Sequence, residues 1–196
     1  MKQLAKILSI SLTCFMLFGC AHPISMNPDL ASVQAKDITP INKKVGYYIS
    51  DASRALELTT GGGGGDKVRY FPYRDIEPGL YKALAEVFTG VAKIKNPQDA
   101  GDLSRNDISL VILPQISTAS SSPSPFTWPP TQFTVTLACT VTDPAGRAVH
   151  NLSVTGNGSA EFDEFKTNFS LAAVRATNDA LSRLIKALGE APELRK

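Results

Sequence analysis

Hydrophobic and polar residues alternate along several stretches of the chain in the way that a half-buried strand requires. In 133–141, FTVTLACTV, every second residue is apolar, and threonines and one alanine stand between them. Successive side chains on a strand point to opposite faces, so this segment predicts a strand with a threonine-rich outer face. The same period of two occurs in 45–49. It returns in 152–162, where Gly156 and Gly158 indicate a bulge or a close backbone contact.

Helical spacing of apolar residues appears twice. In the first helix, Asp75 is the expected N-cap, Pro78 falls in the first turn, and Leu80, Leu84, Val87 and Phe88 share a face. The second is an alanine-rich stripe that ends at Gly189; it consists of Phe169, Ala172, Ala173, Ala176, Ala180, Leu184 and Leu188. Two further strands are predicted at 91–95 and 107–118, the latter with Pro114 at an edge or a bulge.

The predicted order is therefore β-α-β-β-β-β-α. Two helices, each with one apolar stripe, can cover one face of a mixed sheet and leave the other face to solvent. The sequence predicts an α+β two-layer sandwich, with a mixed four- to five-stranded sheet and two helices on one face. The outward threonines of 133–141 fit the solvated face.

The first twenty residues indicate export. Lys2 and Lys6 precede an uncharged run, 7–18, which is too short to span a bilayer as a helix. The tetrapeptide LFGC that ends at Cys20 resembles the lipobox of bacterial lipoproteins. This resemblance implies cleavage before Cys20, a diacylglycerol on its sulfur and an acyl chain on its amine, with no other cofactor. Ala21, where Asp would favour the inner membrane, points to an outer-membrane, periplasm-facing location.

These features predict four regions. Residues 1–19 are the signal peptide, 20–42 the lipidated N-terminus and a flexible proline-containing tether, 43–190 a single periplasmic domain and 191–196 a C-terminal tail. Loss of Lys2 and Lys6 leaves 20 − 2 = 18 basic and 18 acidic residues, so the mature chain has no excess of basic charge with which to bind nucleic acid. Cys139, left without a disulfide partner, is predicted to be buried.

Several sequence segments, taken in order, resemble a known family. The lipobox, the strand, the loop ending PYRDIEPGLYKALAEVF, and a late hairpin before an alanine-rich helix are similar to the YajG-like family of bacterial lipoproteins, over roughly residues 43–190. The five-glycine run and the Ser/Pro-rich insert 120–130 depart from that pattern. The resemblance implies an envelope-facing lipoprotein and assigns no catalytic residue.

The run from Gly61 to Gly65 has three interpretations. A phosphate loop needs a lysine directly after its last glycine, and Asp66 occupies that position, so nucleotide binding is not expected. The run can be a flexible connection from strand to helix. It can also be a clamp that folds aromatic and basic side chains over a partner. The residues concerned are Arg69, Tyr70, Phe71, Tyr73 and Arg74, and packing beneath the loop is their plainer role.

A second candidate surface is the segment 122–133, which contains Phe126 and the single tryptophan, Trp128, among prolines. Prolines stiffen a segment, which suits presentation of a ring to a partner or a membrane. The alternative is a long loop whose ring folds back onto the sheet.

Catalysis and metal binding are not expected. His22 and His150 are far apart in the sequence, and Cys139 lacks companions at metal-ligand spacing. The carboxylates at 161, 163 and 164 are interpreted as a solvated strand end. The leading hypothesis is a non-catalytic, lipid-anchored outer-membrane lipoprotein that binds an envelope protein as an accessory or assembly factor. A ligand-binding module for lipid or glycan is second, and a hydrolase is third.

Overall fold

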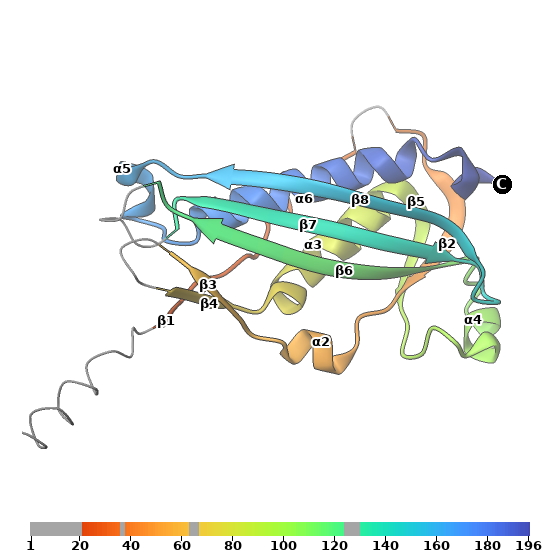
Figure 1. Cartoon of the computed structure of the whole chain (residues 1–196). Helices are drawn as coiled ribbons and strands as arrows, with labels where there is room; N and C mark the ends of the chain where they lie inside the picture. The colour runs from red at the N-terminus through yellow and green to blue at the C-terminus, as the bar shows by residue number, and fades with distance from the viewer. Residues whose placement is uncertain (1–20, 36–37, 63–66, 124–129) are drawn as a thin grey trace, which may run out of the picture.

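The computed structural model describes residues 21–35, 38–62, 67–123 and 130–196 (Figure 1). The predicted signal peptide, Cys20, Phe126, Trp128 and most of the glycine run lie outside the described residues, and the statements made about them stay predictions. In chain order the elements are β1 (Ala21–Pro23), β2 (Ile41–Tyr47), α2 (Asp51–Ala55), β3 (Leu58–Gly61), β4 (Lys67–Tyr70), α3 (Pro72–Val87), β5 (Phe88–Lys93), α4 (Ala100–Arg105), β6 (Leu110–Ser121), β7 (Gln132–Thr142), β8 (Ala148–Ser159), α5 (Phe162–Phe165), α6 (Leu171–Gly189) and the 3-10 helix η2 (Pro192–Arg195).

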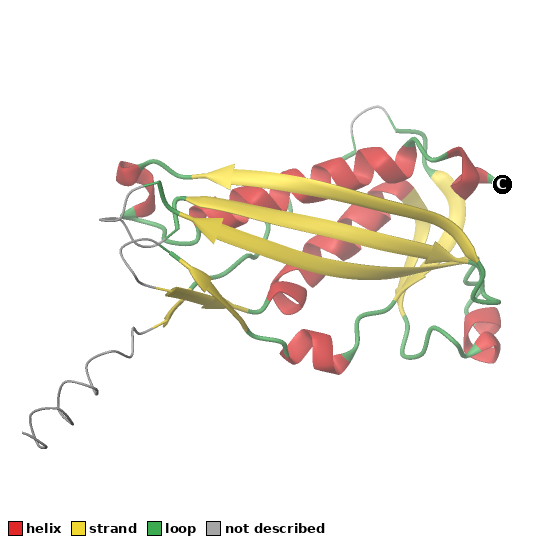
Figure 2. Ribbon diagram, in the orientation of Figure 1, coloured by secondary structure: helices red, strands yellow, loops and turns green. Residues whose placement is uncertain are grey.

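The main sheet has five strands in the order β5-β2-β6-β7-β8. β2 pairs in parallel with β5 and β6, whereas β6, β7 and β8 form an antiparallel meander. The long helices α3 and α6 lie on the same side of this sheet (Figure 2). The predicted α+β sandwich is confirmed. A second sheet of three short strands, in the order β1-β4-β3, was not expected.

The core lies between the main sheet and the two helices. The apolar side chains of β7 are buried as their alternation predicts, and so is the alanine-rich stripe of α6. Pro114 lies on β6 beyond Ile112, where the pairing with β2 ends, so its missing N–H falls on a locally unpaired side of the strand as predicted.

Gly156 and Gly158 bring α6 unusually close to β8. A Cβ on Gly158 would lie 2.1 Å from the Ala172 carbonyl oxygen, and one on Gly156 would lie 2.2 Å from the Ala180 nitrogen. The predicted close backbone contact is therefore confirmed. The irregularity in the β7–β8 register lies elsewhere, between Val141 and Thr142.

The segment predicted to be a tether is part of the folded domain. Met26 and Val33 are fully buried, and Ile41 begins β2. The Met26 N–H donates to Asp75 Oδ2 at 3.1 Å, and the Ala35 N–H donates to Glu86 Oε2 at 2.9 Å. The prolines and the scattered polar residues suggested a linker, but the segment's few apolar side chains reach the core. The prediction of a flexible tether over 21–42 is therefore wrong for the described residues of that segment.

Two other boundary predictions need correction. Asp75 does not cap α3, which begins three residues earlier at Pro72 with Phe71 as N-cap; Asp75 lies buried inside the first turn and accepts the Met26 bond. Residues 191–196 are not a loose tail. Residues 192–195 form η2, in which Leu194 is buried, and Arg195 Nη2 donates to the Thr39 carbonyl oxygen at 2.9 Å.

The outer face of the main sheet is covered at one end only. A small apolar cluster of Ile94, Leu103, Ile108 and Val111 packs there beneath α4 and the loop before β6. Val111 is on the outer face because the inner-facing neighbours of β6 are Ile112 and Ile116. Toward the opposite end, the outer face of β6, β7 and β8 has no helix over it among the described residues (Figure 1).

Cys139 is buried on the inner face, as predicted, and this has a chemical consequence. Burial raises the pKa of its thiol to about 12, so the reactive thiolate is not populated near neutral pH. We expect alkylation of the folded domain at pH 8 to be at least ~1,000-fold slower than alkylation in denaturant, where the thiol pKa returns to about 8.5. Because the thiol pKa is higher in the folded than in the unfolded chain, its contribution to stability is complete below about pH 8.5 and is lost as pH rises through about 12. Alkylation quenched at successive times and analysed by mass spectrometry measures the rate. Equal rates in the folded and denatured protein would contradict the burial of the Cys139 thiol.

Candidate functional site

At one end of the domain, the N-terminal strand is part of the small sheet, which lies beside the end of β6. Ala21, the residue after Cys20, pairs with Lys67 at the start of β4. Gly61, at the end of β3, pairs with Lys67 from the other side and accepts a 2.5 Å hydrogen bond from the Ser120 hydroxyl of β6. We call this region the anchor end, because Ala21 directly follows Cys20, the predicted lipidation site. It comprises β1, β3, β4 and the facing ends of β6 and β7 (Figure 1).

Tyr70 is a core residue and not an exposed clamp. Its ring is buried against Phe133 in an edge-to-face contact, with centroids 5.3 Å apart. Its hydroxyl lies 2.7 Å from the Thr118 hydroxyl and 3.3 Å from that of Thr60. Tyr70 therefore joins the small sheet to β6, which is the plainer packing role considered for it.

Of the other predicted clamp residues, some pack against the sheet and some lie on the surface. Tyr73 is partly buried, and its hydroxyl accepts the Ile116 N–H of β6 at 3.2 Å. Arg74 is exposed and stacks over the Phe71 ring at 3.7 Å. Arg69 is half-exposed and lies 3.8 Å from Glu57. The five side chains do not converge on one surface. The strands on either side of the glycine run, β3 and β4, pair antiparallel, so the run lies between two strands and not between a strand and a helix as predicted.

Near the anchor end, the outer face of the β6–β7–β8 meander forms a continuous surface of uncharged side chains. We call it the polar sheet face. Its strands align in register, so that Ser117, Thr136 and Thr155 form one row across β6, β7 and β8. The neighbouring rows contain only small or uncharged polar side chains: Gln115, Ala138 and Ser153; Ala119, Thr134 and Asn157; Ser121, Gln132 and Ser159. No charged or aromatic side chain occurs in these rows.

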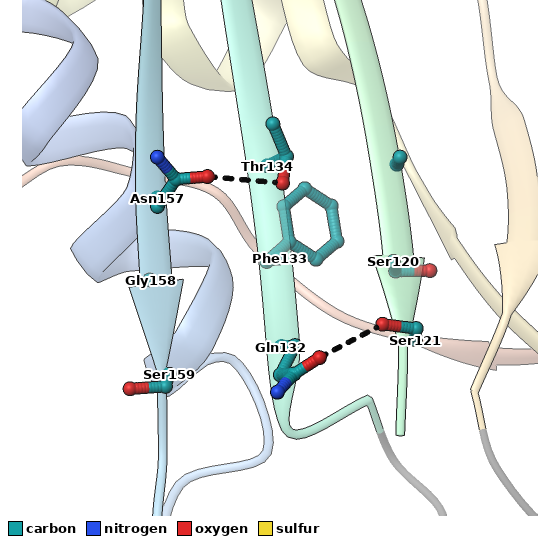
Figure 3. Close-up of a pocket in the computed structure, with 9 residues that line it drawn as sticks. Ser120, Ser121, Gln132, Phe133, Thr134, Asn157, Gly158 and Ser159 are labelled. Carbon is teal, nitrogen blue, oxygen red and sulfur yellow. Dashed lines mark hydrogen bonds between the residues drawn. The ribbon is translucent and has the colours of Figure 1, made fainter. Parts of the chain in front are cut away.

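Cross-strand hydrogen bonds link the side chains of this face. The Thr136 and Thr155 hydroxyls are 3.0 Å apart, Thr134 donates to Asn157 Oδ1 at 3.3 Å, and Ser121 donates to Gln132 Oε1 at 3.3 Å. Figure 3 shows the last two contacts around a hollow of about 410 Å³ at the anchor end. Phe133 also contributes to the lining of this hollow, but its side chain is buried against Tyr70.

The free edge of β8 beside this face is partly blocked. The Asn157 N–H donates to Asp179 Oδ2 of α6 at 2.9 Å, and Arg175 Nη1 donates to the Ser159 carbonyl oxygen at 2.8 Å. These contacts satisfy the backbone groups at the anchor end of an otherwise uncharged edge strand, which limits pairing with another strand there. The face of the sheet, rather than this edge, is the accessible surface.

One partly buried cluster of titratable side chains surrounds Glu77. Glu77 accepts Arg54 Nε at 2.7 Å and the Tyr47 hydroxyl at 3.2 Å. The Arg54 hydrogen bond lowers the pKa of Glu77, while burial, aided by Glu77, raises the pKa of Tyr47 to about 12. A carboxylate so stabilised in its charged form is a weak base, so this cluster is a structural ion pair.

The carboxylates at 161, 163 and 164 need a correction. They lie around the short helix α5 and not along a strand, and Glu164 accepts both Arg175 Nη2 at 2.7 Å and Nη1 at 2.9 Å. These hydrogen bonds lower the pKa of Glu164 to about 2. Within the described ranges no three His, Cys, Asp or Glu side chains come together as a metal site. The same residues contain no helix that is both long and apolar enough to span a bilayer.

Comparisons with known proteins bear on the fold. No family model matches the chain, and no curated protein matches its sequence. A solved structure of a DUF330 family protein from Xanthomonas campestris is similar, with a TM-score of 0.50 and 11% identity, over 88% of this chain and 91% of that one. At that identity the likeness concerns the fold alone.

Two other solved structures overlap less well. One, from Helicobacter pylori, is provisionally described as a homologue of the neuraminyllactose-binding hemagglutinin; its TM-score is 0.44 at 11% identity, over 80% of this chain and 86% of that one. The other, from Caulobacter crescentus, is provisionally described as a lipoprotein; its TM-score is 0.35 at 13% identity, over 67% and 85%. The resemblance to the YajG-like family stays a prediction.

Proposed function

We propose that the protein is a non-catalytic lipoprotein, anchored through Cys20 in the outer membrane and facing the periplasm, that binds an envelope protein on its polar sheet face. The YajG-like resemblance is part of this proposal. The observation that carries it is the composition of that face, which is uncharged across three strands in a chain with 18 acidic residues. The cores of protein interfaces are depleted in charge, because unpaired charges are costly to remove from water.

The position of the anchor supports the same proposal. Because β1 begins at Ala21, no slack segment separates Cys20 from the fold. Acyl chains on Cys20 would hold the anchor end close to the bilayer, and the strands of the polar sheet face lead away from it (Figure 1). A partner in the same membrane could then contact the face from the side.

Charges introduced into the centre of this face should abolish partner binding. We expect Ser117→Arg with Thr155→Arg to reduce the recovery of a crosslinked envelope protein at least ~tenfold, because each guanidinium would be desolvated without a counter-charge. Both positions are exposed, so folding should be unaffected. Crosslinking of native-level protein, followed by mass spectrometry, makes the measurement.

The matched control is Thr89→Arg, which adds the same side chain at an exposed position of β5, the far edge of the sheet. This variant should retain the partner. The proposal is wrong if the control and the double variant recover the same partner equally, or if the parent protein recovers none.

A ligand-binding module is the second candidate, and the hollow at the anchor end favours a glycan over a lipid. Its rim carries the hydroxyl and amide groups of Ser121, Gln132, Asn157 and Ser159, which suit sugar hydroxyls better than acyl chains. Binding of an envelope glycan fraction that is lost in Gln132→Ala, with crosslinked partners unchanged, would favour this candidate.

A further inference from the structure

Two exposed phenylalanines border the short helix α5. Phe162 is 57% exposed and Phe169 is 45% exposed, although the sequence pattern placed both among buried residues. Phe162 begins α5 where the strand pattern was expected to continue, and Phe169 precedes the start of α6 at Leu171. The prediction that these two side chains are buried is therefore wrong, and both lie outside the core of the domain.

The turn that carries Phe162 is held firmly in place. Glu161 and Glu164 form a reciprocal capping box around α5, and Glu164 is bound by two nitrogens of Arg175 in α6. Phe165 is buried beneath the turn, with its ring 5.0 Å from that of Phe162 in an edge-to-face contact. The exposure of Phe162 is thus fixed by a well-bonded element and is not the result of a loose loop.

These side chains lie near the point where the chain approaches the membrane. The Ser25 N–H donates to the Ser170 hydroxyl at 2.9 Å, which places the N-terminal segment beside the residue that follows Phe169. Ala21 is four residues from Ser25, or at most about 14 Å of extended chain. Figure 1 shows α5 and the start of β1 at the same end of the molecule.

We propose that Phe162 and Phe169 enter the interfacial layer of the bilayer that holds Cys20, as a second membrane contact beside the lipid. This inference rests on the proposed lipid anchor. Aromatic side chains favour the membrane interface. Lys166, whose ammonium lies 5.3 Å from the centre of the Phe162 ring, has its charge paired with Asp163 at 2.6 Å.

The contact is apolar and not electrostatic. Around α5 the acidic Glu161, Asp163 and Glu164 outnumber Lys166 and Arg175, so anionic headgroups offer no attraction. An acyl anchor alone is a single point about which a domain can rotate. A second apolar contact would fix the rotation of the domain and set the direction in which the polar sheet face points.

The test is quenching of a tryptophan by lipids with brominated acyl chains. Full-length lipidated protein is reconstituted in zwitterionic phosphatidylcholine vesicles, in a Trp128→Phe background that removes the single native tryptophan. Phe162→Trp supplies the reporter. Tyr81→Trp is the matched control, because Tyr81 on α3 is 48% exposed and lies away from the anchor end. Unchanged thermal unfolding midpoints confirm that both reporters fold.

We expect quenching at position 162 to exceed that at position 81 at least ~threefold, since interfacial side chains reach the acyl boundary. Equal quenching at the two positions in vesicle-bound protein would overturn the membrane contact and leave the lipid anchor intact. Protein that stays in solution, with no acyl mass on Cys20, would overturn both. Crosslinking between copies through position 162, without quenching, would show a protein contact in place of the membrane contact.

Discussion

Replacing Gly158 by alanine is expected to destabilise the domain by about 3 kcal/mol, the upper end of the usual cost of overpacking. The added Cβ would lie 2.1 Å from the Ala172 carbonyl oxygen and 2.4 Å from the Ala176 nitrogen. Both are backbone atoms of α6 and cannot move aside by changing a rotamer. Relief requires α6 to shift away from β8, which opens the core along the alanine stripe. Urea unfolding of residues 21–196, monitored by circular dichroism, measures the loss.

Gly61→Ala is the matched control for this prediction. Gly61 also lies in a strand, β3, but a Cβ there has no atom within 4 Å. Its free energy of unfolding should change by less than about 0.5 kcal/mol, as for most surface substitutions. Equal stabilities of the two variants would show that α6 does not pack against β8 as closely as described.

The second large effect is expected for Met26→Ala, at about 3 kcal/mol. Met26 is fully buried, and its backbone N–H satisfies the buried Asp75 carboxylate in the first turn of α3. Truncation leaves a cavity between the N-terminal segment and α3. The same urea titration measures the change, and it tests whether residues 21–35 belong to the fold.

Leu30→Ala provides the comparison for the same segment. Leu30 is exposed, so removing its side chain creates no cavity and should alter stability by less than about 0.5 kcal/mol. If Met26→Ala were as mild as Leu30→Ala, the N-terminal segment would be the loose tether that its composition suggested.

The sequence predicted those elements whose pattern is long and regular. β7 and α6 follow directly from periods of two and of 3.6. The close approach of α6 to β8 follows from Gly156 and Gly158, two residues without side chains in one strand. The N-terminal segment was missed because its burial depends on isolated side chains such as Met26 and Val33. Isolated apolar residues among prolines carry no period, and only the folded partner α3 decides whether they are buried.

The regular pattern of β7 also made one part of the candidate site predictable. The alternation in β7 placed Thr134 and Thr136 on a solvated face. That Ser117 and Thr155 join them in one uncharged surface depends on the register of three strands, which the sequence alone does not reveal. For Tyr70 the sequence left a clamp and packing beneath the loop open, and only its contact with the Phe133 ring decides for packing.

The proposed outer-membrane function and the proposed membrane contact of Phe162 both require a lipid on Cys20. Mass spectrometry of the mature N-terminal peptide from the membrane fraction should show a chain that begins at Cys20, with a diacylglyceryl group on sulfur and an acyl chain on the amine. Cys20→Ser should remain unprocessed and lack these masses. A mature chain that begins at another residue, or that carries no acyl mass and stays in the soluble fraction, would contradict the account.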